Sequence, residues 1–529
     1  NNTLTNFISR KSVTYFLDMK FVNVLFVVLL YCTHLSAQVT LPNNLYFTHI
    51  GVEDGLCQNT VCCILQDHLG FIWLGTKDGL TRYDGYRFRV FKHDAADPMS
   101  IGNNFIRVLY EDADGLIWIG TNVGVYIYNP ETGNFRKFDV ATERGDVISR
   151  EVSSIKCDSS GDLWIGVNWQ GVFRYDRRDE SLELYEPVPG DTTSLSSVHV
   201  WDLCFDGDGN LWVGSQNGGL DRYDRETDRF VRHRLKGLSD VSRIVLDKQN
   251  QLLLGTMKDG LFSFNPYMGT CQPLLLDSGH KDLFVRAIFV RNSREVVVGT
   301  ENGIYIYDCV TRKTRHVNQE LGNPYSLSCK AVYSIYCDKE GALWIGTYFG
   351  GVNYLPPSSS LIFDKFYPIG HSDRLSGKAV REFVRDESGI IWIGTEDQGL
   401  NRFDPVSGKF THYNSRNSGL SCDNVHGLCV DGDRLYIGTF FGGFNIMDLK
   451  TNEIVALGSQ MLPDDSVFSI FRDHDGRIWV GLTYGLCLFH PEDGSFELVR
   501  EIPENLFIYD IYQGDDGIIY FAAYNRGVI

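Results

Sequence analysis

Aromatic and amide side chains occur together in three short polar loops of the chain. The loops read VNWQG at 167–171, SQNGG at 215–219 and TYFGG at 347–351, and their candidate contact residues are Asn168, Trp169, Gln216, Asn217, Tyr348 and Phe349. An aromatic ring offers an apolar face for stacking, and neighbouring amides donate and accept hydrogen bonds. A sugar has both kinds of surface, so these six residues are candidate saccharide contacts. The alternative is that the rings pack on adjacent loops of the protein itself.

No order of side chains in the sequence predicts catalysis or metal binding. The thirteen histidines are scattered, and no Cys/His pair or Ser/His/Asp order stands out. The acidic stretch DGDG at 206–209 lacks the glutamate that an EF-hand loop places at its twelfth position, where Asn217 stands. We therefore expect no catalytic residue, no metal and no cofactor in this chain.

The net charge of the chain limits the classes of molecule that it is expected to bind. The 529 residues carry a formal net charge of −18, and a nucleic-acid-binding protein needs a basic face, so we expect no nucleic acid to bind here. A local basic pocket for an anionic ligand is compatible with this total. Five arginines within 222–234 could meet an acidic sugar, but they alternate with acidic residues and are predicted to form a solvated charged edge.

One sequence repeat occurs about eleven times along the chain. It centres on the glycine of W-x-G-T and recurs every 41 to 48 residues, at Gly75, Gly120, Gly166, Gly214, Gly255, Gly299, Gly346, Gly394, Gly438 and Gly481, with Ala522 in a last, degenerate copy. A period of this length indicates a solenoid, an array or a propeller, because each unit must stack on its neighbours to bury its core.

Each repeat predicts four antiparallel strands. An apolar, β-branched run ends at a D-x-x-G turn, a strand with tryptophan follows, and a third strand ends in Y-D or F-N before a fourth. Four such strands in about 45 residues make one propeller blade. Seven of the nine tryptophans occupy one repeat position, where Leu253 and Val297 replace them elsewhere. This position is therefore predicted to fill volume between blades.

The repeats predict an all-β chain of two rings. After the seventh repeat the turn is replaced by PPSSS, so we expect a seven-bladed β-propeller over 45–355, a linker at 356–360 and a partial second propeller of about four blades over 361–529. The β stretch at 45–50 has no blade before it. We expect it to complete the seventh blade and remove the free sheet edge.

The amino end predicts export. From Met19, a basic start, an apolar run and a small-residue site match a secretory signal peptide at 19–37, with 1–18 an upstream extension. An uncleaved anchor is the alternative. The cysteines of this exported chain stand at interior strand positions, and we expect most of them to be free and buried.

The repeat D-x-x-G-x-I-W-I-G-T-x-x-G-L-x-R-Y-D, with the start F-x-H-I-G-V-E-D-G-L at 47–56, resembles the two-component-regulator propeller repeat, and the resemblance covers 45–529. The order of segments is similar to the periplasmic sensor of hybrid two-component systems. The resemblance implies an oligosaccharide ligand released from a complex polysaccharide and a homodimer whose geometry switches a kinase. It also implies parts beyond this chain, namely the rest of the second propeller, a β-sandwich, an inner-membrane helix, a histidine kinase, a receiver and a DNA-binding domain.

The expected function is therefore that of a periplasmic sensing region, truncated before its kinase, without enzymatic activity and in contact with the membrane only through the missing parts. Two alternatives stay open. A secreted propeller enzyme, a lyase or hydrolase acting on sugars or lactones, would place a charged cluster with a metal or an acid/base pair in its central channel. A surface adhesion protein would lack a kinase downstream.

Overall fold

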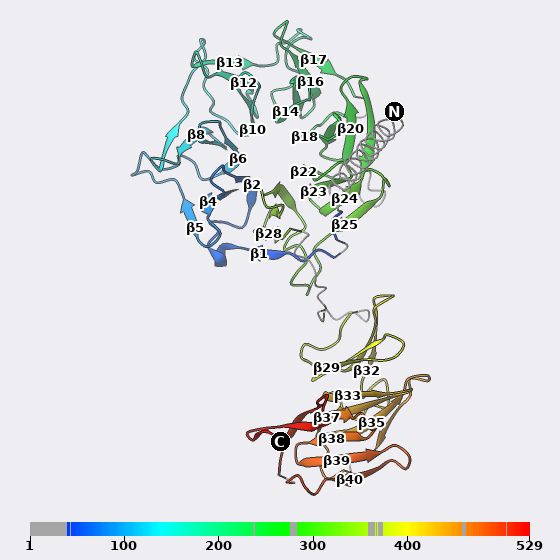
Figure 1. Ribbon diagram of the computed structural model, residues 1–529. Coiled ribbons are helices and arrows are strands. Elements are labelled where there is room, and N and C mark those ends of the chain that lie inside the picture. Colours follow the sequence, from blue (N-terminus) through cyan, green and yellow to red (C-terminus); the bar gives the residue numbers. More distant parts are fainter. Residues whose placement is uncertain are drawn as a thin grey trace, which may run out of the picture. The chain divides into compact units, whose positions relative to one another are not determined.

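The computed structural model describes residues 40–42, 44–235, 238–275, 283–357, 366, 368, 374–457, 462–503 and 505–529. The predicted signal peptide, the extension before it, most of the expected linker and nearly all of the β stretch expected after that linker lie outside these residues. The chain divides into unit 1, Asn1–Glu320 with Tyr325–Ile362, and unit 2, Leu321–Pro324 with Phe363–Ile529 (Figure 1).

The described part of unit 1 contains seven four-stranded antiparallel sheets. In chain order of their first strands they are β2 (Val61–Gln66), β3 (Ile72–Thr76), β4 (Gly79–Tyr83), β5 (Phe88–Phe91); β6 (Ile106–Glu111), β7 (Ile117–Thr121), β8 (Gly124–Asn129), β9 (Asn134–Lys137); β10 (Val152–Cys157), β11 (Leu163–Val167), β12 (Gly171–Asp176), β13 (Ser181–Tyr185); β14 (Val200–Phe205), β15 (Leu211–Ser215), β16 (Gly219–Asp224), β17 (Arg229–His233); β18 (Arg243–Leu246), β19 (Leu252–Gly255), β20 (Leu261–Asn265), β21 (Thr270–Leu275); β22 (Val285–Val290), β23 (Glu295–Thr300), β24 (Gly303–Asp308), β25 (Thr314–Val317); and β26 (Val332–Cys337), β27 (Leu343–Thr347), β28 (Val352–Leu355) with β1 (Thr48–Ile50). One 3-10 turn, η1 (Val52–Asp54), follows β1.

The described part of unit 2 continues the same pattern with three four-stranded sheets and one three-stranded sheet. They are β29 (Val380–Arg385), β30 (Ile391–Thr395), β31 (Gly399–Asp404), β32 (Lys409–Tyr413); β33 (Val425–Asp431), β34 (Arg434–Thr439), β35 (Gly443–Asp448), β36 (Ile454–Leu457); β37 (Val467–Arg472), β38 (Ile478–Leu482), β39 (Gly485–His490), β40 (Ser495–Leu498); and β41 (Ile508–Gln513), β42 (Ile519–Ala523), β43 (Gly527–Val528). The predicted all-β class is confirmed.

The D-x-x-G stretches form the predicted hairpin turns. In the first of them the Gly70 amide donates to the Asp67 carbonyl oxygen at 3.1 Å, and Gly70 has a φ of 95°, a conformation that favours glycine. The Asp67 carboxylate accepts the Phe71 amide at 2.8 Å, which closes the turn from inside. The aspartate thus fixes the hairpin before the second strand begins.

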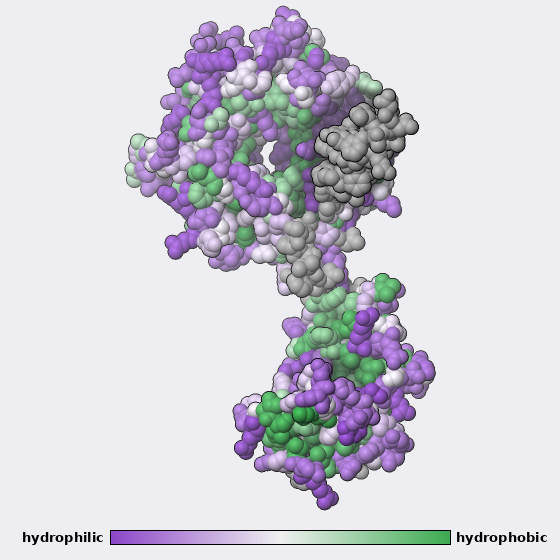
Figure 2. Space-filling model, viewed as in Figure 1, coloured by the Kyte–Doolittle hydropathy of each residue, from purple (hydrophilic) through white to green (hydrophobic). Residues whose placement is uncertain are grey.

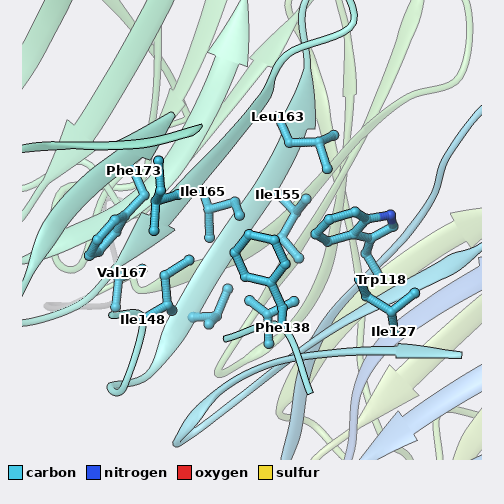
Figure 3. Packing of buried hydrophobic residues seen from close by; sticks show 12 residues of the cluster. Trp118, Ile127, Phe138, Ile148, Ile155, Leu163, Ile165, Val167 and Phe173 are labelled. Atoms are coloured by element: carbon cyan, nitrogen blue, oxygen red, sulfur yellow. The ribbon is translucent and has the colours of Figure 1, made fainter. Parts of the chain in front are cut away.

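In the repeats that carry the tryptophan, the turn aspartate also holds its indole. The indole Nε1 donates to the aspartate Oδ2 at 2.8 to 3.2 Å in seven sheets, in the pairs Trp73–Asp67, Trp118–Asp112, Trp164–Asp158, Trp212–Asp206, Trp344–Asp338, Trp392–Asp386 and Trp479–Asp473. A buried indole N–H needs such an acceptor. The indole rings lie within the apolar clusters, as predicted for a position that fills volume; Figure 3 shows Trp118 among the buried residues shared by the β6–β9 sheet and its neighbour.

The repeat glycine lets adjacent sheets of unit 1 meet closely. A Cβ on it would stand only 2.6 to 2.9 Å from a side-chain carbon of the next sheet, in the pairs Gly75–Ile106, Gly120–Val152, Gly166–Val200, Gly214–Val241, Gly255–Val285, Gly299–Val332 and Gly346–Val61. Any larger residue would push the two sheets apart. The last pair joins the seventh sheet to the first.

The sheets of unit 1 follow one another around a ring. The first strands adjoin in the order β2, β6, β10, β14, β18, β22, β26 and back to β2 (Figure 1). β1, from the amino end, pairs antiparallel with β28, with Thr48 opposite Tyr354 and Ile50 opposite Val352. The predicted pairing of the amino-terminal strand with the last sheet of the unit is therefore confirmed.

Candidate functional site

A cavity of about 250 Å³ lies where the seven first strands of unit 1 converge. Each of these strands contributes at least one lining residue, and those seven residues are Cys62, Arg107, Ser153, Trp201, Arg243, Arg286 and Tyr333. Figure 2 shows an opening at the centre of unit 1. The cavity is thus built from the whole ring, and no single sheet could form it.

β-bulges direct six of these side chains into the cavity. Near the start of six first strands the pairing with the second strand shifts by one residue, which leaves Cys62, Arg107, Ser153, Trp201, Arg286 and Tyr333 without a cross-strand partner. A bulge redirects the unpaired side chain. The residue after the bulge returns to the regular alternation, as Cys63 does by packing beside Trp73 in an apolar cluster.

Hydrogen bonds and ring contacts hold the cationic lining residues in place. The Arg107 Nε donates to Asn122 at 2.7 Å, and its guanidinium lies 4.2 Å from the Phe105 ring centroid. Arg286 donates to Glu301 at 2.7 Å and lies 3.7 Å from the Phe284 ring. These contacts fix both planar guanidinium groups, so the cavity presents them in defined directions.

The predicted loop at 167–171 lies at the cavity. Asn168 lines it and is hydrogen-bonded to His199 Nδ1 through Oδ1 at 3.2 Å. Trp169 is 66% exposed, and its ring meets the His199 ring edge to face with centroids 4.1 Å apart. Trp169 also adopts a φ of 71°, which is unfavourable for a bulky residue. An exposed indole held in this way has a free face for a ligand.

The loop at 347–351 also meets the lining of the cavity. Tyr348 accepts a hydrogen bond from Lys77 Nζ at 2.9 Å, and its ring lies 5.0 Å from that of Tyr333. Lys77 and Tyr333 are both lining residues. Phe349 is 71% exposed and packs against Tyr348 with ring centroids 4.3 Å apart. Tyr348 therefore lies at the rim, with Phe349 outside it.

The loop at 215–219 meets the same neighbourhood through its backbone. The Gln216 amide donates to the His199 carbonyl oxygen at 3.0 Å, whereas the Asn217 amide donates to the Asp240 carboxylate at 2.9 Å. Neither side chain lines the cavity. The structure therefore brings Asn168, Trp169 and the Gln216 backbone together around His199 and leaves Asn217 apart.

Sequence reasoning missed the residues that line the cavity most directly. Arg107, Trp201, Arg286 and Tyr333 each stand thirteen residues before the glycine of their repeat, and so does Cys62. Reading down this one column of the aligned repeats would have found them. The column looked uninformative because its residue types differ from sheet to sheet.

The bulge positions of unit 2 are mainly aromatic. The bulges there leave Arg381, His426, Phe468 and Tyr509 unpaired. The His426 and Phe468 rings lie 4.2 Å apart, and burial lowers the pKa of His426 to about 4. Phe441, in the loop between β34 and β35, is 70% exposed. Three of these four residues in unit 2 thus carry rings, whereas the equivalent positions of unit 1 are of mixed type.

Two further sequence interpretations have structural outcomes. The twelve described cysteines are free thiols as predicted, but only Cys429 and Cys487 are fully buried, and the other ten are partly exposed. The arginines of 222–234 do not form only a solvated edge: Arg225 pairs with Asp158 at 2.6 Å, and Arg232 donates to carbonyl oxygens of the 191–195 loop.

No helix of the described residues is long and apolar enough to cross a membrane.

Five segments of the chain match the sequence profile described as two component regulator propeller: residues 55–78, 100–123, 194–217, 326–349 and 461–484. Each segment includes a first strand, its D-x-x-G turn and the second strand that carries the tryptophan. The chain carries two-component regulator propeller repeats. A stretch of 59 residues is also 39% identical to histidine kinase P4 of Formosa agariphila. That stretch is 11% of this chain and only 4% of the length of the kinase.

Solved structures share the fold of this chain. The extracellular domain of a putative hybrid two-component system of B. thetaiotaomicron is 21% identical and has a TM-score of 0.59, over 92% of this chain and 83% of the other. A second such extracellular domain of the same organism is 19% identical with a TM-score of 0.52, over 91% of this chain and 71% of the other. The resemblance extends through both units.

Proposed function

We propose that the chain is the ligand-sensing, periplasmic region of a hybrid two-component sensor kinase and that its ligand is an oligosaccharide released from a complex polysaccharide. The observation that carries the proposal is the series of regulator propeller repeats in both units, in a fold shared with extracellular domains of putative hybrid two-component systems. The exposed Trp169 beside Asn168 supports a saccharide as the ligand, because it combines a stacking face with an amide.

We propose the following domain arrangement for this region. Residues 45–355 form a closed seven-bladed propeller, 356–360 a linker and 361–529 the first part of a second propeller, after a signal peptide at 19–37. The cyclic order of seven first strands in unit 1 and the four successive sheets of unit 2 support it. In this proposal the region signals to a membrane-anchored histidine kinase of the same protein.

Signalling in this proposal depends on differential affinity. A ligand shifts an equilibrium between two arrangements only by as much as it binds one of them better. The region would act as a homodimer, and the bound oligosaccharide would favour the packing of propellers or protomers that switches the kinase. The chain itself would leave the ligand chemically unchanged.

The alternative of a propeller enzyme would require a base or acid poised near neutral pH in the cavity. A charged cluster does converge there, but its acidic lining residue, Glu151, is paired with Arg107 at 3.0 Å. Burial raises the pKa of Cys62 to about 11 and that of Tyr333 to about 12. These groups favour binding over proton transfer.

The test is to pass enzymatic digests of several polysaccharides over the purified chain, elute what is retained and identify it by mass spectrometry. The proposal predicts that one class of oligosaccharide is retained and recovered with unchanged mass. Recovery of a cleaved or unsaturated product would favour the enzyme. Retention of intact polysaccharide but of no oligosaccharide would favour an adhesion protein.

A further inference from the structure

The central cavity of unit 1 carries more positive than negative charge. Its cationic lining residues are Lys77, Arg107, Arg243 and Arg286. Glu151, the acidic lining residue, pairs with Arg107 at 3.0 Å, and Glu301 pairs with Arg286 at 2.6 Å. Lys77 and Arg243 remain without a paired carboxylate, although the chain as a whole has a net charge of −18.

The two remaining cations have only neutral hydrogen-bond partners. Lys77 donates to the Tyr348 hydroxyl at 2.9 Å, and Arg243 donates to the Ser242 carbonyl oxygen at 2.8 Å. Neither has a carboxylate within 4 Å among the described residues. Asp202 attracts Arg243 from a longer distance, but its carboxylate already accepts hydrogen bonds from three other groups. An unpaired charge in a partly buried site is costly unless something binds it.

A third donor in the cavity, besides these two cations, has no hydrogen-bond partner at all among the described residues. This donor is the indole Nε1 of Trp201, which is buried. An ammonium, a guanidinium and an indole can only donate. The ligand that satisfies them must therefore bring acceptor oxygens.

The guanidinium groups also repel one another. Burial lowers the pKa of Arg243, and the nearby positive charges of Arg286 and Arg107 lower it further. Bringing a negative charge between them would replace this repulsion by attraction. Arginine binds planar or tetrahedral oxyanions through paired N–H groups, which suits a carboxylate or a sulfate.

We propose that this central cavity binds the anionic substituent, a carboxylate or a sulfate ester, of an acidic saccharide. That the ligand is a saccharide rests on the proposed function. That it carries a negative charge rests on the donors Lys77, Arg243 and Trp201, which no carboxylate of the protein satisfies among the described residues. Phe105, Trp201 and Tyr333 supply aromatic surface in the same cavity. Its volume of about 250 Å³ is just under the range of about 300–1,000 Å³ for drug-sized ligands, so it would take one acidic sugar and leave the remaining sugars at the rim, near Trp169.

The experiment is calorimetric titration of the purified chain with three probes: trigalacturonic acid for the carboxylate, a chondroitin 4-sulfate disaccharide for the sulfate, and neutral galactotriose. The proposal predicts that at least one acidic probe binds roughly tenfold or more tightly than galactotriose. Its affinity should fall as sodium chloride is raised. Arg243→Gln should weaken it roughly tenfold or more, because a buried charge then loses its partner.

Matched variants separate a local effect from a change in net charge. Arg229→Gln removes the same charge from an exposed position on β17 and should leave affinity within about twofold. Lys77→Gln should weaken binding as Arg243→Gln does, and thermal unfolding checks that each variant is folded. Arg243→Lys, which keeps the charge, should retain more affinity than Arg243→Gln.

Three results would overturn the inference. Equal binding of galactotriose and the acidic probes would refute the anionic site while leaving a saccharide sensor intact. Equal loss of affinity in Arg243→Gln and Arg229→Gln would show that only net charge matters. Failure of both acidic probes would contradict the site as stated, whereas the retention experiment with polysaccharide digests decides the proposed function separately.

Discussion

The bond between the turn aspartate and the indole can be isolated by comparing two sheets of unit 1. In the seventh sheet the Asp338 carboxylate accepts the amides of residues 340 and 342 and also Trp344 Nε1 at 2.8 Å. In the fifth sheet the Asp247 carboxylate accepts the amides of residues 249 and 251, but Leu253 replaces the tryptophan. Asp338→Ala and Asp247→Ala therefore remove the same turn bonds, and only the first also leaves an indole N–H without its acceptor.

The expected difference follows from the charge of the acceptor. A hydrogen bond to a charged group contributes about 1.5–3 kcal/mol, so Asp338→Ala should destabilise unit 1 by about 1.5–3 kcal/mol more than Asp247→Ala does. With an unfolding entropy of about 2.1 cal/mol/K per residue, this corresponds to roughly 2–5 °C in the melting temperature of a unit of this size. Differential scanning calorimetry of both variants measures it.

A double-mutant cycle supplies the internal check. Trp344→Phe removes the donor, so Asp338→Ala should cost about 1.5–3 kcal/mol less in that background. Equal melting temperatures for Asp338→Ala and Asp247→Ala, or additive effects in the cycle, would refute the argument that this bond stabilises the repeat.

Three other variants test separate parts of the account. Burial raises the pKa of Asp221 to about 6; its protonated form is thus favoured by folding, and that stability is lost as the pH rises from about 4 through 6. Asp221→Asn, which copies Asn353 at the equivalent repeat position, should therefore be more stable by up to about 3 kcal/mol above pH 6, and an equal advantage at pH 4 in urea denaturation would be inconsistent with this cause. Gly346→Ala should cost about 1–3 kcal/mol in the same assay, because its Cβ would meet the Ser334 hydroxyl of its own sheet and stand 2.8 Å from a Val61 methyl carbon of the first sheet; an unchanged denaturation midpoint would contradict the close packing around this glycine. Trp169→Ala should weaken saccharide binding by roughly tenfold in calorimetric titration and leave the melting temperature within about 1 °C, since the ring is 66% exposed; a large fall in melting temperature would mean that the ring has a packing role.

The regular part of the fold could be predicted from the sequence because it depends on residues that every repeat shares. Asp67, Gly70 and Trp73 define a turn and a core position by their chemistry alone, and the spacing of later repeats confirms them. The strand at the amino end was predictable for a related reason, since no blade precedes it and the seventh blade lacks a fourth strand of its own. These features are local, and each is repeated many times along the chain.

The lining of the cavity could not be predicted in the same way. A β-bulge interrupts the alternation that tells which side chains face the core, so Arg107 and Arg286 read as ordinary strand residues. Their convergence with Arg243 depends on the closure of the ring over more than a hundred residues. The aromatic loops were found because aromatic and amide residues stand together there in short polar loops, but their relation to His199 and Lys77 required the structure.

The central claim is that a saccharide binds unchanged in the cavity of unit 1. The most direct measurement is a crystal structure of the chain with the tightest-binding saccharide from the titrations. The account predicts an intact saccharide whose acidic group contacts Arg243, with density extending toward Trp169. Density for the ligand on unit 2 or on the outer strands of unit 1, with the cavity of unit 1 holding none of it, would contradict the account.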